Sequence, residues 1–258
     1  MKGINVIKQG IFKAAALGAL MLAGVSGYGP AAQAQSTIFN IPTTDTVSPK
    51  KGYLEFDYLV QLPVADGAGR TQIFLPRIVV GVAPNLEVGA NFANIRCCGS
   101  GAETYSFFQP NAKYKFYSND DKGWAIAAGG IGYTPINKRD GVDSYGLIYG
   151  ALSKKVKSSE FGPRITIGPY GIVGAEETYY GTKAGAIVGF EQPVTSKVSF
   201  VADWFSGVSG FGYFTPGISI VVPHNGLLNF GYSFGNDSWG DVSNNNRYFF
   251  AYYGVTFP

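Results

Sequence analysis

Charged and amide side chains recur at every second position along several stretches of the sequence. Glu55 and Asp57 form one such pair, and Lys113 and Lys115 form another of opposite sign. A period of two places these groups on one face of a β-strand, with apolar side chains on the other. Charges around a shared interior suit a narrow solute path, because charged side chains set the selectivity of a pore. The residues that this pattern assigns to an interior, lumen-lining face are Glu55, Asp57, Arg77, Glu87, Asn91, Gln109, Asn111, Lys113, Lys115, Arg164, Glu191, Asp203 and Asn229.

The elements that must position these side chains are strands of about ten residues, the length that a tilted strand needs to cross a membrane. The clearest is 108–116, where Phe108, Tyr114 and Phe116 share one face and the two lysines share the other. The predicted strands are 53–62, 71–82, 86–94, 108–116, 124–133, 145–153, 164–173, 184–192, 198–205, 213–222, 227–234 and 248–257. Aromatic residues near strand ends predict girdles at the membrane interfaces; they are Tyr53, Phe116, Trp124, Tyr145, Phe234 and Tyr248.

The connections between these segments alternate between short and long. Five are tight, and six, including 95–103 and 235–247, are longer and more polar. Outer-membrane barrels have short periplasmic turns and longer external loops. We therefore expect the tight turns and both ends of the barrel to face the periplasm.

Residues 1–34 have the three parts of a secretory signal peptide. Lys2, Lys8 and Lys13 are basic, an apolar stretch follows at 14–25, and Ala32-Gln33-Ala34 supplies the small-x-small cleavage pattern. We expect cleavage before Gln35. Residues 35–51 then form an extended periplasmic lead-in, with a small N-terminal plug as the alternative, and 52–258 form the barrel.

The composition supports an exported membrane barrel. Removal of the signal peptide takes away three of the 20 Lys and Arg and none of the 17 Asp and Glu, which leaves 17 of each. A neutral mature chain without clustered basic residues excludes a nucleic-acid footprint. Charged residues make up 14% of the chain, whereas soluble domains carry about 25%. No apolar run after Gln35 can form a spanning helix, so the fold class is an all-β, up-and-down antiparallel barrel of about twelve strands; the alternative is a soluble β-sandwich.

Two kinds of short sequence stretch resemble segments of known outer-membrane proteins. The C-terminal stretch 248–257 (YFFAYYGVTF) resembles the last strand by which the barrel-assembly machinery recognises such proteins, although Pro258 follows it. The segments 81–89 (GVAPNLEVG) and 110–116 (PNAKYKF) resemble the outer-membrane channel group called "MetA-pathway of phenol degradation" proteins. The resemblance implies a porin-like transporter and assigns no individual site residue.

Catalytic chemistry has little support in the sequence. The lone histidine, His224, lies in a predicted turn, and the carboxylate pairs lie in connections. Cys97 and Cys98 are adjacent in a predicted external loop, where a disulfide, a bridge to another chain and two free thiols all stay open. We expect no enzyme activity, no cofactor and no metal site.

The leading functional hypothesis is a Gram-negative outer-membrane channel for passive or facilitated passage of small solutes through a narrow, mixed-charge lumen. The alternatives are a non-conducting structural or surface-binding barrel, in which the interior charges pair and block flow, and more remotely a lipid-modifying barrel enzyme. Expected partners are outer-membrane lipids, the barrel-assembly machinery and a small solute. The sequence indicates neither the solute nor the oligomeric state.

Overall fold

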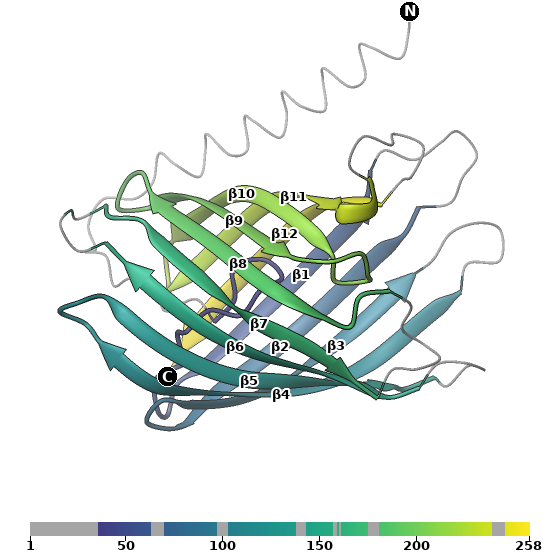
Figure 1. The fold of residues 1–258 in the computed structure, drawn as a ribbon, viewed down its shortest axis with the longest axis horizontal. Helices are drawn as coiled ribbons and strands as arrows, with labels where there is room; N and C mark the ends of the chain where they lie inside the picture. Colours follow the sequence, from purple (N-terminus) through teal and green to yellow (C-terminus); the bar gives the residue numbers. More distant parts are fainter. Residues whose placement is uncertain are drawn as a thin grey trace, which may run out of the picture. The chain divides into compact units, whose positions relative to one another are not determined.

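Twelve antiparallel strands make up the fold in the computed structural model, which describes residues 36–62, 70–96, 103–137, 143–156, 159, 161–174, 181–238 and 246–258 (Figure 1). The strands are β1 (Gly52–Gln61), β2 (Gln72–Ala83), β3 (Leu86–Arg96), β4 (Thr104–Asn119), β5 (Trp124–Pro135), β6 (Tyr145–Lys155), β7 (Arg164–Val173), β8 (Ala184–Pro193), β9 (Val198–Phe205), β10 (Tyr213–Val222), β11 (Gly226–Gly235) and β12 (Arg247–Phe257). A 3-10 turn, Asn236–Ser238, follows β11.

The strands form a closed barrel in which each pairs with its neighbours in the sequence and β1 pairs with β12. Antiparallel registers such as Gly52 opposite Phe257 close the ring. The predicted fold class is therefore confirmed, with all twelve strands close to their expected positions. Strand β4 is longer than the predicted 108–116, because its ladder to β3 continues from Leu86–Tyr114 to Arg96–Thr104.

The two faces of the wall carry the side chains that the alternation predicted. On β4, Phe116 is 62% exposed and Tyr114 45%, while Lys113 is 2% exposed. Closing a barrel removes every strand edge, which is the condition for burying a sheet in lipid. The apolar outer face and polar inner face agree with that environment.

Half of the expected aromatic girdle faces the other way. Phe116 and Trp124 are exposed on the outer face, but Tyr53, Tyr145 and Tyr248 lie on the inner face. Tyr53 donates a hydrogen bond to Glu55, and Tyr145 stacks on inward Tyr133. The girdle prediction was wrong for these three tyrosines, because strand parity, rather than nearness to a strand end, decides which face a residue occupies.

Short turns connect the strands at one end of the barrel, and the longer connections lie at the other. The turn between β2 and β3 consists of two residues, and its Asn85 adopts φ 64°. Gly52 and Phe257 also lie at the end with the short turns. Among the described residues, no helix has the length and apolar character needed to cross a membrane.

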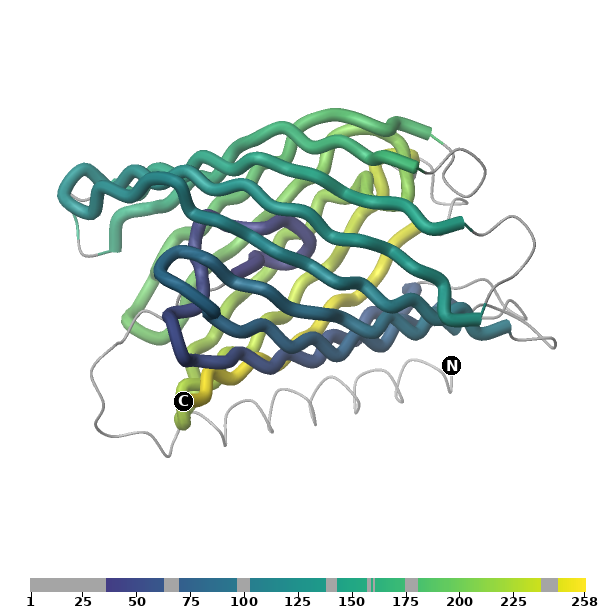
Figure 2. Tube along the Cα trace, turned by 90° about the horizontal axis from the view of Figure 1, so that it is seen from below, coloured from purple at the N-terminus to yellow at the C-terminus, as the bar shows by residue number. Residues whose placement is uncertain are grey.

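Residues 36–47 lie inside the barrel and are called the inner segment (Figure 2). We expected an extended periplasmic lead-in here, and the plug was the alternative. The segment runs inward from β1 and reverses at residues 38–41, where the Ile38 amide donates to the Ile41 carbonyl. Ile38 and Ile41 are fully buried. An apolar reversal of this kind packs against the wall because water would otherwise contact its isoleucines.

Candidate functional site

All thirteen residues predicted to line the lumen are on inner faces of the barrel wall. Most are buried, and the partly exposed ones are Arg77, Asn111, Lys115, Arg164 and Glu191. Eleven of the thirteen, all except Asp57 and Lys115, take part in hydrogen-bonded or ion-paired groups within the described part of the chain. The site is therefore a polar interior occupied by a segment of the same chain.

Asp203 on β9 holds the reversal of the inner segment through consecutive backbone amides. Its Oδ2 accepts hydrogen bonds from the amides of Phe39 (3.0 Å), Asn40 (2.5 Å) and Ile41 (3.0 Å). The Asn40 side-chain amide adds contacts to Asp203 Oδ1 (3.4 Å) and to Thr215 Oγ1 (3.0 Å). Successive amides that converge on one anion form a strong site, because hydrogen bonds to an ionised acceptor are about twice as strong as neutral ones.

Glu87 and Lys113 hold the other part of the inner segment. Their ion pair measures 3.0 Å between Oε1 and Nζ. Lys113 Nζ also donates to the Ser36 carbonyl (3.0 Å) and hydroxyl (2.8 Å), and Glu87 accepts from the Ser36 hydroxyl (2.5 Å) and the Val47 amide (2.8 Å). One buried pair thus binds both the beginning and the end of the segment.

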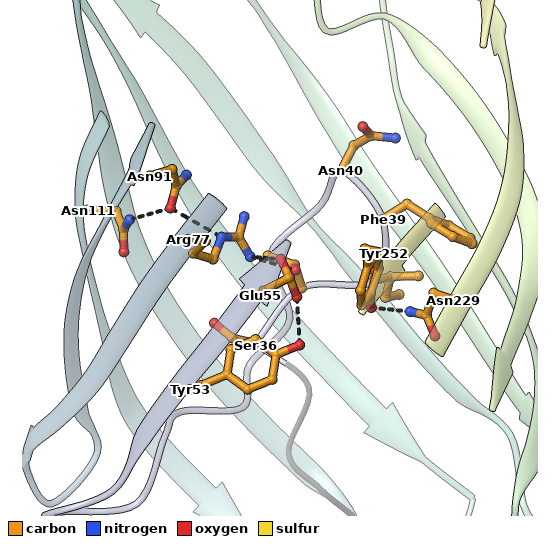
Figure 3. A network of polar contacts seen from close by, with 12 residues as sticks. Ser36, Phe39, Asn40, Tyr53, Glu55, Arg77, Asn91, Asn111, Asn229 and Tyr252 are labelled. Carbon is orange, nitrogen blue, oxygen red and sulfur yellow. Dashed lines mark hydrogen bonds and ion pairs between the residues drawn. The ribbon is translucent and has the colours of Figure 1, made fainter. Parts of the chain in front are cut away.

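Arg77 links the inner segment to a network on β1 to β4 (Figure 3). It pairs with Glu55 at 2.9 Å, donates to Thr37 Oγ1 at 2.8 Å and donates to Asn91 Oδ1 at 3.2 Å. Glu55 also accepts from Tyr53 at 2.6 Å. The amide network then continues along the inner face, from Asn91 to Gln109 (3.1 Å) and from Asn111 to Asn91 (3.1 Å).

Arg164 joins the segment to β7 and β8. It forms two hydrogen bonds with Glu191, at 2.5 and 2.7 Å, and pairs with Asp45 of the inner segment. Burial alone would raise the pKa of the Asp45 carboxyl, but the charge and hydrogen bond of Arg164, helped by Lys113 and Lys115, hold that pKa below its usual value.

Tyr252 on β12 contacts the segment from the opposite direction. Its hydroxyl donates to the Ile38 carbonyl (2.9 Å) and accepts a hydrogen bond from the Asn229 side-chain amide. Asp57 lies opposite Tyr252 in the β1–β12 register. Asp57 has no ion pair within the described part of the chain.

Glycines on the inner wall make room for the apolar tip of the segment. A Cβ at Gly189 would lie 2.6 Å from side-chain atoms of both Ile38 and Ile41, and one at Gly231 would lie 2.7 Å from the Phe39 ring. Such distances are shorter than packed carbon atoms tolerate. The glycines are therefore needed for close approach between wall and segment.

Aromatic side chains line the interior nearer the longer connections. Tyr133 and Tyr145 stack with ring centroids 4.5 Å apart, and Phe211 meets Tyr133 edge-on at 5.5 Å. Phe205 packs on Tyr170 at 5.0 Å. The interior thus changes from charged at the inner segment to aromatic beyond it.

Several other predicted features lie apart from this interior. Cys97 and Cys98 fall outside the described residues. His224 lies in the short turn after β10 with φ 61°. In the described ranges, no group of three or more His, Cys, Asp and Glu side chains is arranged to hold a metal ion.

Comparison with solved structures finds an outer-membrane protein with a similar barrel fold. It is similar to a COG4313 outer membrane channel from Pseudomonas putida F1, with a TM-score of 0.53 and 12% identity over 90% of this chain and 100% of that one. The translocator domain of the autotransporter NalP from Neisseria meningitidis aligns with a TM-score of 0.40 and 11% identity, over 97% and 98% of the two chains. No family model and no curated protein sequence matches. At 12% identity the first likeness shows the fold alone, and that fold is the barrel that the sequence predicted.

The sequence pattern identified the wall residues but not what they bind. The inner segment supplies the amide partners of Asp203 and further partners for Glu87, Lys113 and Arg164, whereas the sequence predicted a periplasmic lead-in there, with a plug as the alternative. One signal was available: the apolar run Ile38-Phe39-Asn40-Ile41 is unsuited to an extended solvent-exposed linker.

Proposed function

We propose that this chain is an outer-membrane channel for passive or facilitated passage of small solutes, and that the inner segment closes the path while it occupies the lumen. One observation carries the proposal. The twelve strands close the barrel without the segment, whereas the segment is held inside mainly by wall side chains such as Asp203 and Glu87. When the segment leaves, water replaces these hydrogen bonds, so the net cost is far smaller than the strength of the bonds in isolation. The segment can therefore leave while the wall stays intact.

The lining of the interior indicates the kind of solute that this path suits. A barrel of twelve strands encloses more space than an eight-stranded one, whose interior is filled by side chains, and less than a porin of sixteen or more. Charges of both signs lie beside the inner segment, and aromatic rings such as Tyr133 and Phe205 lie beyond it. This combination fits a small solute with a polar and an apolar part. The likeness to a protein described as an outer membrane channel supports the same class of function.

The remaining assignments belong to the same proposal. Export with cleavage before Gln35, insertion in a Gram-negative outer membrane by the barrel-assembly machinery, and contact of the outer face with lipid all follow from a membrane channel. We assign the chain no catalytic role. N-terminal sequencing of the membrane-bound protein tests the export step, since a first residue other than Gln35 would contradict it.

Conductance in planar bilayers tests the channel. The mature protein should be closed or weakly conducting, and deletion of residues 36–47 should give stable openings with the barrel still folded, as judged by heat-modifiable gel mobility. Liposome swelling with neutral sugars then measures the size limit for solutes. A folded deletion variant that neither conducts nor swells liposomes would favour the non-conducting structural barrel instead.

A reversible cross-link tests whether the segment itself is the closing element. A Cβ at Gly189 would lie 3.6 Å from Ile41 Cγ1, so Ile41→Cys and Gly189→Cys are neighbouring positions for a disulfide, which needs Cβ atoms about 3.5 to 4.5 Å apart. Ile38→Ala removes the side chain that the new Cβ would also meet. Cys97→Ser and Cys98→Ser remove the native thiols. The oxidised protein should stay closed under voltage and urea that open the matched parent, and reductant should restore opening. Equal conductance before and after reduction would contradict the role of the segment.

A further inference from the structure

Two buried oxygen atoms on the inner wall lack a hydrogen-bond partner among the described residues: Asp57 Oδ1 and Asn229 Oδ1. Asp57 is 4% exposed and Asn229 is fully buried. Glu55, two residues from Asp57 on the same face, is paired with Arg77 and accepts a hydrogen bond from Tyr53. Asp57 shares the field of Arg77 with Glu55 but has no ion pair of its own among the described residues, and burying an ion without a direct partner costs several kcal/mol.

Asp57 and Asn229 lie on either side of Tyr252 in one row across the wall. The registers place Asp57 opposite Tyr252 on β12 and Tyr252 opposite Asn229 on β11. Neighbouring strands are about 4.8 Å apart. The row therefore gathers a carboxylate, an amide oxygen and a phenol oxygen on one side of the wall, next to the Ile38 carbonyl that accepts from Tyr252. Figure 3 shows Tyr252 and Asn229 in contact beneath the inner segment.

The charges and donor types of this row favour one class of ligand. Glu55, Asp57 and Arg77 carry a net charge of −1 when all are ionised, so a single positive charge balances them. Carboxylate, amide and phenol oxygens are hard donors, which suit hard cations. A proton on Asp57 would satisfy the carboxyl group but leave Asn229 Oδ1 unpartnered. A cation bound at Tyr252, which separates the two residues in this row, would have to reach both orphan oxygens to serve both.

We propose that Asp57, Asn229 and Tyr252 form a binding site for a monovalent metal cation, Na⁺ or K⁺, in the wall behind the inner segment. Because Tyr252 also holds the Ile38 carbonyl, the bound cation stabilises the wall that the segment packs against. The site does not depend on whether the barrel conducts.

The test uses the mature protein refolded in detergent and unfolded by heat. Tm is measured in chlorides of Na⁺, K⁺ and N-methyl-D-glucamine at constant ionic strength. A ligand that binds only the folded state raises Tm with its concentration, so Na⁺ or K⁺ should raise Tm and the bulky organic cation should not. Asp57→Asn should abolish the response, and Asn229→Leu should weaken the apparent affinity about tenfold. Asp120→Asn, an exposed carboxylate in a short turn, is the matched control and should respond as wild type does.

A second measurement needs no variant and so holds even if Asp57→Asn fails to fold. Crystals of the wild-type protein grown in rubidium chloride should show an anomalous peak between Asp57 and Asn229. No peak there, a Tm equal in all three salts, or a full cation response in Asp57→Asn would overturn the site. If Tm does not depend on the cation but falls as pH rises, the site is overturned, because a proton bound to Asp57 then neutralises the carboxylate.

Discussion

Two parts of the inner wall hold the same segment by different means. The charged wall, on β1 to β4, contains ion pairs between its own residues, Glu55 with Arg77 and Glu87 with Lys113. Side chains of these pairs also form hydrogen bonds with the segment. The hollowed wall, on β8 to β11, offers glycines that leave space and the carboxylate of Asp203, whose described partners include three amides of the segment. The comparison shows which contacts belong to the wall and which exist only while the segment is inside.

This difference has a consequence for opening. When the segment leaves, the charged wall keeps its ion pairs, but Asp203 loses three amide donors and the glycine hollows lose the side chains that fill them. The energy that retains the segment should therefore be concentrated on the hollowed wall. Four predictions test this, from the largest expected effect to the smallest.

Asp203→Ala should release the segment. Removing one side of a buried, charged contact costs about 3 to 5 kcal/mol, because the amides of residues 39–41 are left without an acceptor. Hydrogen exchange measured by mass spectrometry should show loss of protection at residues 39–41, with an increase in bilayer conductance. Asp120→Asn again serves as control. If protection is retained in Asp203→Ala, the charged wall, and not the hollowed wall, holds the segment more strongly.

Gly231→Val should push the tip of the segment from its hollow. Overpacking costs about 1 to 3 kcal/mol, and the added Cβ would meet the Phe39 ring. Limited proteolysis of the N-terminus should accelerate, and Phe39→Ala should restore resistance by making room. Gly150→Val is the control, since a Cβ there meets only Pro169 side-chain atoms, at 3.6 Å and beyond. If Phe39→Ala gives no rescue, the hollow does not hold the segment.

Glu87→Gln combined with Lys113→Met should cost only about 1 kcal/mol of segment retention. Replacing both members of a buried pair by neutral groups of similar size is often nearly neutral, and the glutamine side chain keeps an oxygen for the Val47 amide. Lys113→Met alone should cost more, because Glu87 stays charged. Hydrogen exchange at Val47 measures both. A double variant as open as Asp203→Ala would show that the charged wall is an equal anchor.

The Asp45–Arg164 pair should contribute least, about 0.5 kcal/mol, because the two side chains are partly exposed. The direction in which this contribution changes with pH follows from the lowered pKa of Asp45. The contribution is complete above the usual carboxyl pKa of about 3.9 and is lost as pH falls through the lower value in the folded protein. As pH falls from about 4 through the lower pKa of Asp45 in the folded protein, segment retention should decline more in wild type than in Asp45→Asn. Parallel pH profiles would contradict the pairing.

Much of the barrel could be predicted because its signal is local. Strands β7 and β9 have the predicted bounds, 164–173 and 198–205. Alternation of polar and apolar residues with a period of two identifies a strand and shows which of its faces meets lipid. The same parity placed Lys113 inside and Tyr114 outside. It also explains the error at Tyr53, where nearness to a strand end was weighed above parity.

The sequence by itself therefore determined the strands, their faces and the polar interior. Only the tertiary structure decided that those polar groups meet a segment of the chain rather than an open water path. The physical reason is distance along the sequence: Asp203 and Phe39 are 164 residues apart, and no local pattern pairs a carboxylate with amides so remote. Gly189 and Gly231 likewise acquire their purpose only when the closed barrel brings Ile41 and Phe39 against them.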